Sequence, residues 1–184
     1  MATAAQLDIN TAVTAEDMFN EIFGDSISLV SATYTGATAS SGTYSGGDAT
    51  SAELTPADTG VILSTGLATS VTNASGDVNS SASTTGIMNT QGDSDLDQVA
   101  GSSTYDAAVL EAVFVPDGSV LTLQVVFSSE EYLEYVNSGF NDAVGVFVNG
   151  EKAQLTVGEG DITSDNINDV SNENRYSDNS SADD

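Results

Sequence analysis

The chain has 184 residues, enough for one domain with a core, and its 28 acidic and 2 basic side chains give it a formal net charge of −26. This charge excludes nucleic acid and anionic membrane surfaces as direct partners, and its self-repulsion predicts help from divalent cations, high salt or a basic partner. The sequence has neither Cys nor His, which excludes disulfides, a Ser-His-Asp triad and thiolate or imidazole metal sites, so any metal would bind through oxygen, as Ca²⁺, Mg²⁺ or Mn²⁺ do.

A short helix is predicted near the N-terminus. Thr14 is a suitable N-cap, Asp17 completes the Asp variant of a capping box, and Gly24 is a natural stop. The apolar stripe between them consists of Met18, Phe19, Ile22 and Phe23. We expect this helix to pack on a sheet.

The next part of the chain has the composition of β-strands and polar loops. Residues 26–36 are rich in β-branched and aromatic side chains, and residues 59–68 form a short apolar run bounded by Gly. Residues 69–92 are rich in Ser, Thr, Gly and Asn, which indicates surface loops.

Two hairpins are predicted farther along the chain. Residues 108–115 lead through Pro116-Asp117-Gly118 into residues 119–127, and each of these two segments has one apolar face. Residues 143–148 are followed by Asn149-Gly150, the preferred type I′ turn, from which the chain returns as a strand.

These elements predict a mainly β fold. Many short strands with Gly-rich turns and one short N-terminal helix favour an antiparallel sandwich or a jelly roll. We expect residues 1–184 to form a single domain, in which residues 158–184 are an acidic, polar loop or tail.

The stretch "FSSEEYLEYVNSGFNDAVGVFVNG" (127–150) gathers acidic residues with no Lys or Arg to offset them. Glu130, Glu131, Asn141 and Asp142 could together bind a calcium ion through their oxygens. The alternative is that Glu130 or Asp142 caps backbone N–H groups while the others are solvated, since their spacing matches no standard calcium loop.

A second acidic stretch, "GDSDLDQVAG", places Asp93, Asp95 and Asp97 at alternate positions, as at the start of an EF-hand loop. The sixth position is Gln98 instead of Gly, and the twelfth is Thr104 instead of Glu, which excludes an EF-hand. An irregular Ca²⁺ site stays open, and so does an acidic surface loop with Asp93 as the N-cap of a helix.

Other polar residues leave alternatives open. Asp106 either caps a turn or joins the other carboxylates as a ligand. Tyr34 and Tyr44 could meet a carbohydrate or protein partner, although loops of this composition are more often only solvated. Glu130 and Asp142 could form the carboxylate pair of a sugar hydrolase, but the chain has no Trp to line a sugar cleft, and we predict no enzymatic activity.

Several motifs together resemble the choice-of-anchor L domain family. They are "GVILSTG" (60–66), "GDSDLDQVAG" (92–101), "TYDAAVLEAVFVPDG" (104–118), and Ser-Glu-Glu-Tyr followed by Asn-Asp-x-x-Gly (129–145). The resemblance implies a mostly β, secreted bacterial surface domain but does not define its activity. Together with the acidic excess and the lack of His and Cys, it favours a calcium-stabilised binding module that acts in adhesion or in the extracellular matrix. In similar proteins the domain precedes calcium-binding repeats and a type I secretion signal, which fits the lack of a classical signal peptide at the N-terminus.

The chain departs from the family pattern near its end. Members continue past "NRYSDN" (174–179) with further strands, so the resemblance predicts a domain truncated at its C-terminal strands. Exposed sheet edges would then accept a strand from another copy, which makes a self-assembling subunit the alternative function. No window is apolar over the ~18 residues that a membrane helix needs.

Overall fold

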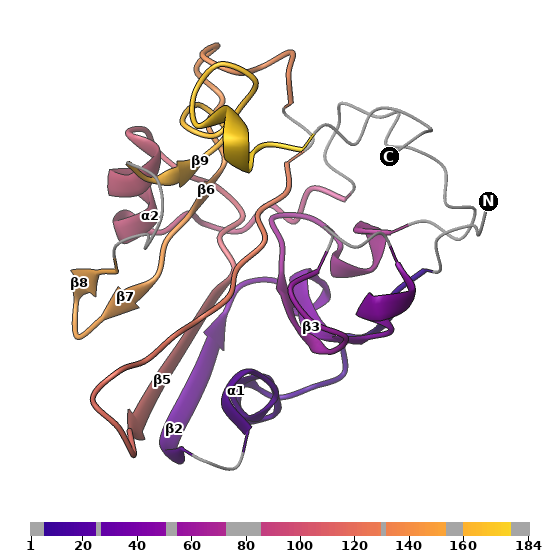
Figure 1. The fold of residues 1–184 in the computed structure, drawn as a ribbon, viewed down its shortest axis with the longest axis vertical. Coiled ribbons are helices and arrows are strands. Elements are labelled where there is room, and N and C mark those ends of the chain that lie inside the picture. Colours follow the sequence, from indigo (N-terminus) through magenta and orange to yellow (C-terminus); the bar gives the residue numbers. More distant parts are fainter. Residues whose placement is uncertain are drawn as a thin grey trace. The chain divides into compact units, whose positions relative to one another are not determined.

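The computed structural model describes residues 6–24, 27–50, 55–72, 86–129, 132–153 and 160–177. In these ranges the chain forms short antiparallel sheets and two α-helices (Figure 1), which confirms the predicted mainly β class. Whether the sheets belong to a sandwich or a jelly roll stays a prediction. The chain divides into two compact units, which we call the first unit (Met1–Asp77, Thr85–Thr90 and Asp106–Val126) and the second unit (Val78–Thr84, Gln91–Tyr105 and Phe127–Asp184).

The first unit contains two sheets and a helix. One sheet has the strand order β1-β3-β4, and the other pairs β2 with β5. The elements are β1 (Asp8–Asn10), α1 (Ala15–Phe23), β2 (Ser28–Thr35), β3 (Ser41–Ser45), β4 (Gly60–Leu63) and β5 (Val109–Val115), with the 3-10 helices η2 (Thr38–Ser40), η3 (Gly47–Ala49) and η4 (Ala68–Ser70).

Helix α1 forms as the sequence predicts. The Thr14 hydroxyl accepts a hydrogen bond from the Asp17 backbone N–H at 3.1 Å, and the Thr14 N–H donates to the Asp17 carboxylate at 2.9 Å. These bonds complete the capping box and hold the pKa of Asp17 below its ordinary value. The rings of Phe19 and Phe23 lie 5.4 and 5.6 Å from that of Phe114 in β5, so the helix packs on the β2–β5 sheet.

Strand β5 pairs with β2 and not with the segment that follows it. The register joins Tyr34 to Leu110 and Leu29 to Phe114. The prediction of a strand over residues 119–127 is wrong, because this segment has no regular structure and Figure 1 draws it as a plain trace. A strand exists only where a neighbour supplies a ladder of hydrogen bonds, and alternating polarity does not reveal which neighbour is used.

The second unit is built from smaller pieces. They are α2 (Ser94–Ala100), β6 (Ala143–Val144), β7 (Phe147–Val148), β8 (Glu151–Lys152), β9 (Ile162–Thr163) and the 3-10 helix η5 (Glu173–Arg175). Strands β7 and β8 pair with each other and are connected by Asn149 and Gly150. Both connecting residues have a positive φ (53° and 80°), so the predicted turn is confirmed. The return strand ends at Lys152 in the described chain, and residues 154–157 lie outside the described residues.

Candidate functional site

The acidic residues before and within α2 hold its two ends in place. The Asp93 carboxylate accepts hydrogen bonds from the N–H groups of Asp95 (2.9 Å) and Leu96 (3.2 Å), which confirms that Asp93 is the N-cap. The Asp97 carboxylate accepts from both the N–H and the hydroxyl of Thr104, at 2.6 and 2.7 Å. These two bonds hold the pKa of Asp97 below its ordinary value.

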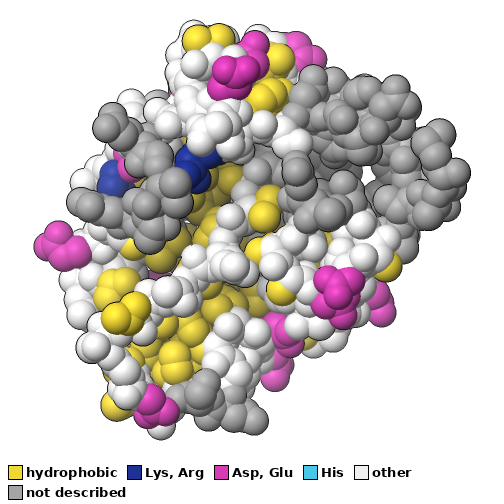
Figure 2. Space-filling view, in the orientation of Figure 1, with side chains coloured by type: hydrophobic (Ala, Val, Ile, Leu, Met, Phe, Trp, Pro, Cys, Tyr) yellow, Lys and Arg dark blue, Asp and Glu magenta, His cyan; other side chains and the backbone are white. Residues whose placement is uncertain are grey.

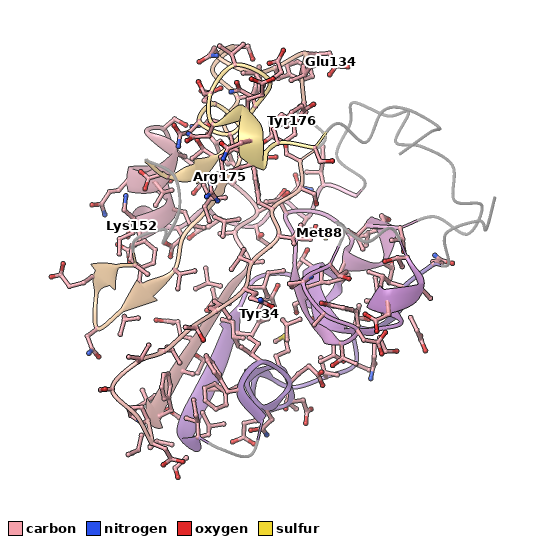
Figure 3. All side chains as sticks on the ribbon, in the orientation of Figure 1. Tyr34, Met88, Glu134, Lys152, Arg175 and Tyr176 are labelled. Atoms are coloured by element: carbon pink, nitrogen blue, oxygen red, sulfur yellow. The ribbon has the colours of Figure 1, made fainter. Side chains whose placement is uncertain are left out.

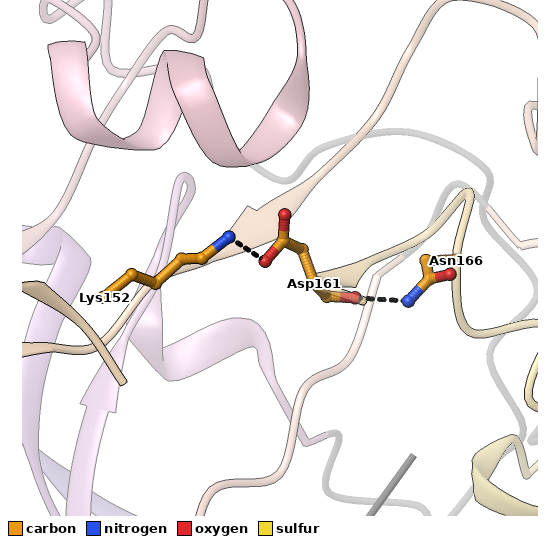
Figure 4. A network of polar contacts seen from close by, with 3 residues as sticks. All are labelled: Lys152, Asp161 and Asn166. Carbon is orange, nitrogen blue, oxygen red and sulfur yellow. Dashed lines mark hydrogen bonds and ion pairs between the residues drawn. The ribbon is translucent and has the colours of Figure 1, made fainter. Parts of the chain in front are cut away.

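The third acidic residue of this stretch, Asp95, has a different hydrogen-bond partner. Its carboxylate accepts a bond from the Gln98 amide at 3.3 Å. A cavity of about 290 Å³ opens beside it in the second unit, lined by Asp95, Gln98, Val99, Phe147, Gly150 and Lys152. The Lys152 ammonium forms an ion pair with Asp161, whose backbone carbonyl accepts a bond from the Asn166 amide at 2.8 Å (Figure 4). The positive charge of Lys152 at this cavity is therefore already neutralised by Asp161.

Asn141 joins three segments of the second unit. Its amide donates to the carbonyl of Ala100 at 2.9 Å, and its side-chain oxygen accepts from the Asp165 N–H at 3.0 Å and the Ser164 hydroxyl at 3.3 Å. The neighbouring Asp142 carboxylate accepts from the Ser129 hydroxyl at 2.7 Å. Asn141 thus serves as a cross-link between the end of α2 and the turn after β9.

Asp106 lies in the first unit, whereas the other predicted ligands lie in the second. Its carboxylate accepts from the Thr90 N–H at 2.5 Å and from the Met88 N–H at 3.2 Å. Asp106 therefore holds backbone N–H groups of residues 88–90, and its role as a metal ligand stays a prediction.

The structure brings few of the predicted ligands together. In the described ranges, no three acidic side chains form a group that could hold a metal ion. Glu130 and Glu131 lie outside the described residues. Calcium binding by the predicted set stays a prediction.

The two tyrosines considered for a binding surface are engaged within the first unit. The Tyr34 hydroxyl donates to the Ala37 carbonyl at 2.9 Å, and the buried Tyr44 donates to the Ala57 carbonyl at 3.2 Å. Burial raises the pKa of both. Tyr44 therefore does not present its ring to a partner.

In the second unit, the rings of Phe127, Tyr132 and Tyr176 form an aromatic cluster. The Tyr132 ring lies 6.3 Å from that of Phe127 and 5.1 Å from that of Tyr176. Burial and, to a smaller extent, the nearby Tyr176 and Asp142 together raise the pKa of Tyr132 to about 12.

Sequence reasoning missed two polar residues of the second unit. Asn168 is buried, and its amide donates to the carbonyls of Ser164 (3.1 Å) and Asp165 (3.0 Å) while its oxygen accepts two backbone N–H groups. Arg175 has a buried Nε with no hydrogen-bond partner. The rarity of basic residues was the one available signal for Arg175, and no signal marked Asn168.

Comparison with known proteins gives one match. The family model for the Choice-of-anchor L domain matches residues 6–183. No curated protein and no solved structure is significantly similar to the chain. None of the described helices is long and apolar enough to cross a membrane.

Proposed function

The chain belongs to the choice-of-anchor L domain family, and we propose from this membership that it is a calcium-stabilised adhesion module of a bacterial surface or extracellular matrix. The family is a non-catalytic domain of secreted or surface-anchored bacterial proteins. The match over residues 6–183 is the observation that carries the proposal, because it takes in nearly the whole chain.

The charge balance supports the calcium part of the proposal. In the described residues, Lys152 with Asp161 is the sole salt bridge. The carboxylates of Asp93, Asp97 and Asp106 are held by N–H and hydroxyl donors, which leave their negative charge in place. A net charge of −26 then opposes the compact state, and a bound divalent cation would offset part of it.

Thermal unfolding tests this proposal. Free calcium about 100-fold above its Kd would stabilise the folded chain by about 2.7 kcal/mol, or roughly 5–11 °C in Tm for a chain of this size. Chelated protein is compared with protein in calcium chloride, and sodium chloride at equal ionic strength separates binding from screening. Melting curves that coincide in the two salts would refute calcium stabilisation.

Variants then locate the ion. The double variant E130Q/E131Q removes two predicted ligands and should abolish the calcium-dependent rise in Tm. The double variant E134Q/E151Q is the matched control, because it removes the same number of charges at two exposed acids that are not predicted ligands. Equal loss in the control would mean that calcium acts through overall charge alone.

The cellular location has its own test. Protease added to intact cells of the source bacterium should degrade the protein, or the protein should accumulate in the culture medium. Full protection until the cells are lysed would contradict a surface role.

A second candidate function, self-assembly by strand pairing, is favoured by residues 119–127. This segment has strand composition, but no backbone hydrogen bond joins it to another described residue. Its five aliphatic side chains are between 40% and 81% exposed: Val120, Leu121, Leu123, Val125 and Val126. Figure 2 shows hydrophobic side chains gathered over this part of the first unit. An unpaired apolar segment with strand composition can pair with a strand of another chain.

The segment is suited to pairing with itself. An antiparallel register centred on Leu123 sets Leu121 against Val125 of the other copy and brings no charged residue opposite another. The variant L123E would place two carboxylates face to face and should give a monomer in light scattering. Val170→Glu is the control, because Val170 is an 85% exposed aliphatic residue elsewhere. A wild-type chain that is monomeric at every soluble concentration would exclude this candidate.

A further inference from the structure

Arg175 is one of two basic residues in the chain, and the two have different surroundings. Lys152 pairs with Asp161, whereas the described chain offers Arg175 no salt bridge and its Nε is buried without a hydrogen-bond acceptor. Both side chains are labelled in Figure 3. With 28 acidic residues available, a guanidinium without an acidic partner calls for a physical reason.

Leaving this group unpaired is unfavourable. A guanidinium carries its charge at every physiological pH and has five N–H donors in a planar fork. A buried donor without an acceptor has lost its bond to water and gained nothing in return. Burial of the arginine stem against apolar atoms would explain the position of the side chain, but it would not explain an Nε that lacks an acceptor.

The segment that carries Arg175 is well fixed. The Arg175 N–H donates to the carbonyl of Asn172 at 2.9 Å, and the next N–H, of Tyr176, donates to Glu173 at 3.1 Å. Before it, the buried Asn168 holds the preceding loop through four hydrogen bonds. The backbone at Arg175 is therefore positioned before any ligand arrives, which lowers the entropic cost of binding.

We propose that Arg175 is the anchor of an oxyanion-binding site, which accepts a carboxylate or phosphate group from a ligand outside the chain. The Nε and one terminal nitrogen of an arginine form an edge that matches two oxygens of such a group. Arg175 as a whole is only partly buried, and ligand binding would require a rotamer change that turns the buried Nε edge to solvent. A bound oxyanion would then supply the acceptor that Nε lacks.

The net charge sets the conditions under which this site works. At low ionic strength, a charge of −26 repels any anion. At physiological ionic strength the screening length is about 8 Å, so distant carboxylates contribute little and the local guanidinium dominates. The site is independent of the calcium proposal, and its test is carried out in the presence of a chelator.

The experiment compares wild type with R175Q, R175K and K152Q. The control K152Q loses the same charge as R175Q at the other basic residue. Tm is measured with sodium phosphate and, separately, with sodium glucuronate, each balanced with sodium chloride to one ionic strength. With a probe at about five times its Kd, wild type and K152Q should gain about 2–4 °C. R175Q should gain nothing, and R175K should gain less than wild type because ammonium lacks the planar fork.

The results also separate the ligand classes. A rise with phosphate alone assigns the site to phosphate groups, a rise with glucuronate alone assigns it to carboxylates, and a rise with both assigns it to oxyanions in general. An equal rise in R175Q, or no rise in wild type with either probe, overturns the proposal. Failure of R175Q to fold without a probe also overturns it, because a side chain that awaits an external partner is not needed for folding.

Discussion

Replacing Phe19 by Ala tests the packing of α1 on the β2–β5 sheet. Phe19 is 1% exposed, and its ring lies 4.8 Å from Phe23 and 5.4 Å from Phe114. Truncating a buried Phe costs about 3–5 kcal/mol through lost transfer energy and the cavity left behind. A small protein has about 5–15 kcal/mol in total, so F19A should lower Tm by roughly 6–20 °C.

The assay is reversible unfolding in urea, followed by tyrosine fluorescence and circular dichroism. Phe140→Ala is the matched control, because Phe140 is 59% exposed although its ring also lies 5.5 Å from another, that of Tyr135. We expect the control to cost less than about 1 kcal/mol. The double variant F19A/F114A should show a coupling of about 0.5–1.5 kcal/mol. A cost for F19A as small as that of F140A would refute this account of the core.

Three further predictions concern local features. Thr14→Ala removes the N-cap of α1 and should cost about 1 kcal/mol in urea unfolding; no change would mean that the capping box is dispensable. The pKa of Asp97 is lower in the folded chain than its ordinary value of 3.8, so its stabilising contribution is present above that value and is lost as pH falls through the folded pKa. D97N should therefore flatten the loss of stability measured in acid, and an unchanged profile would contradict the Thr104 bonds. Gly150→Ala, at a φ of 80°, should cost about 1–2 kcal/mol and speed amide exchange in β7 and β8, unless the turn relaxes to another type.

Local signals predicted the parts of the fold whose partners are close in sequence. Thr14 and Asp17 are three residues apart, Asn149 and Gly150 are adjacent, and Asp93 bonds within the first turn of its helix. Each of these arrangements is favourable in a short peptide, so the pattern alone is sufficient.

The pairing of β5 with β2 could not be predicted in this way. Leu29 meets Phe114 across a long stretch of intervening chain. The alternation in both segments predicts which face is apolar, but many other segments share that alternation. The Pro-Asp-Gly turn after residues 108–115 instead favours pairing with the nearer segment, residues 119–127.

The candidate site shows the same division between local and distant partners. A carboxylate that binds metal and one that accepts N–H bonds are the same residue type, and only the groups that face it distinguish the two roles. For Asp97 the donor is Thr104, and for Asn141 one partner is Ala100, 41 residues away. The sequence identified polar residues that matter, but their role as cross-links depends on tertiary contacts that it does not display.

Hydrogen bonding and charge neutralisation are separate ways to stabilise a carboxylate, and this chain relies on the first. A donor that bonds to the ionised form lowers the pKa, as Thr104 does for Asp97. The bond thereby secures the negative charge that opposes compaction. Each such bond makes the folded chain more firmly anionic, so the fold gains local order while its demand for cations is undiminished. Because the Thr104 donors also occupy the Asp97 oxygen, a cation that offsets the charge would bind at carboxylates that such bonds leave open.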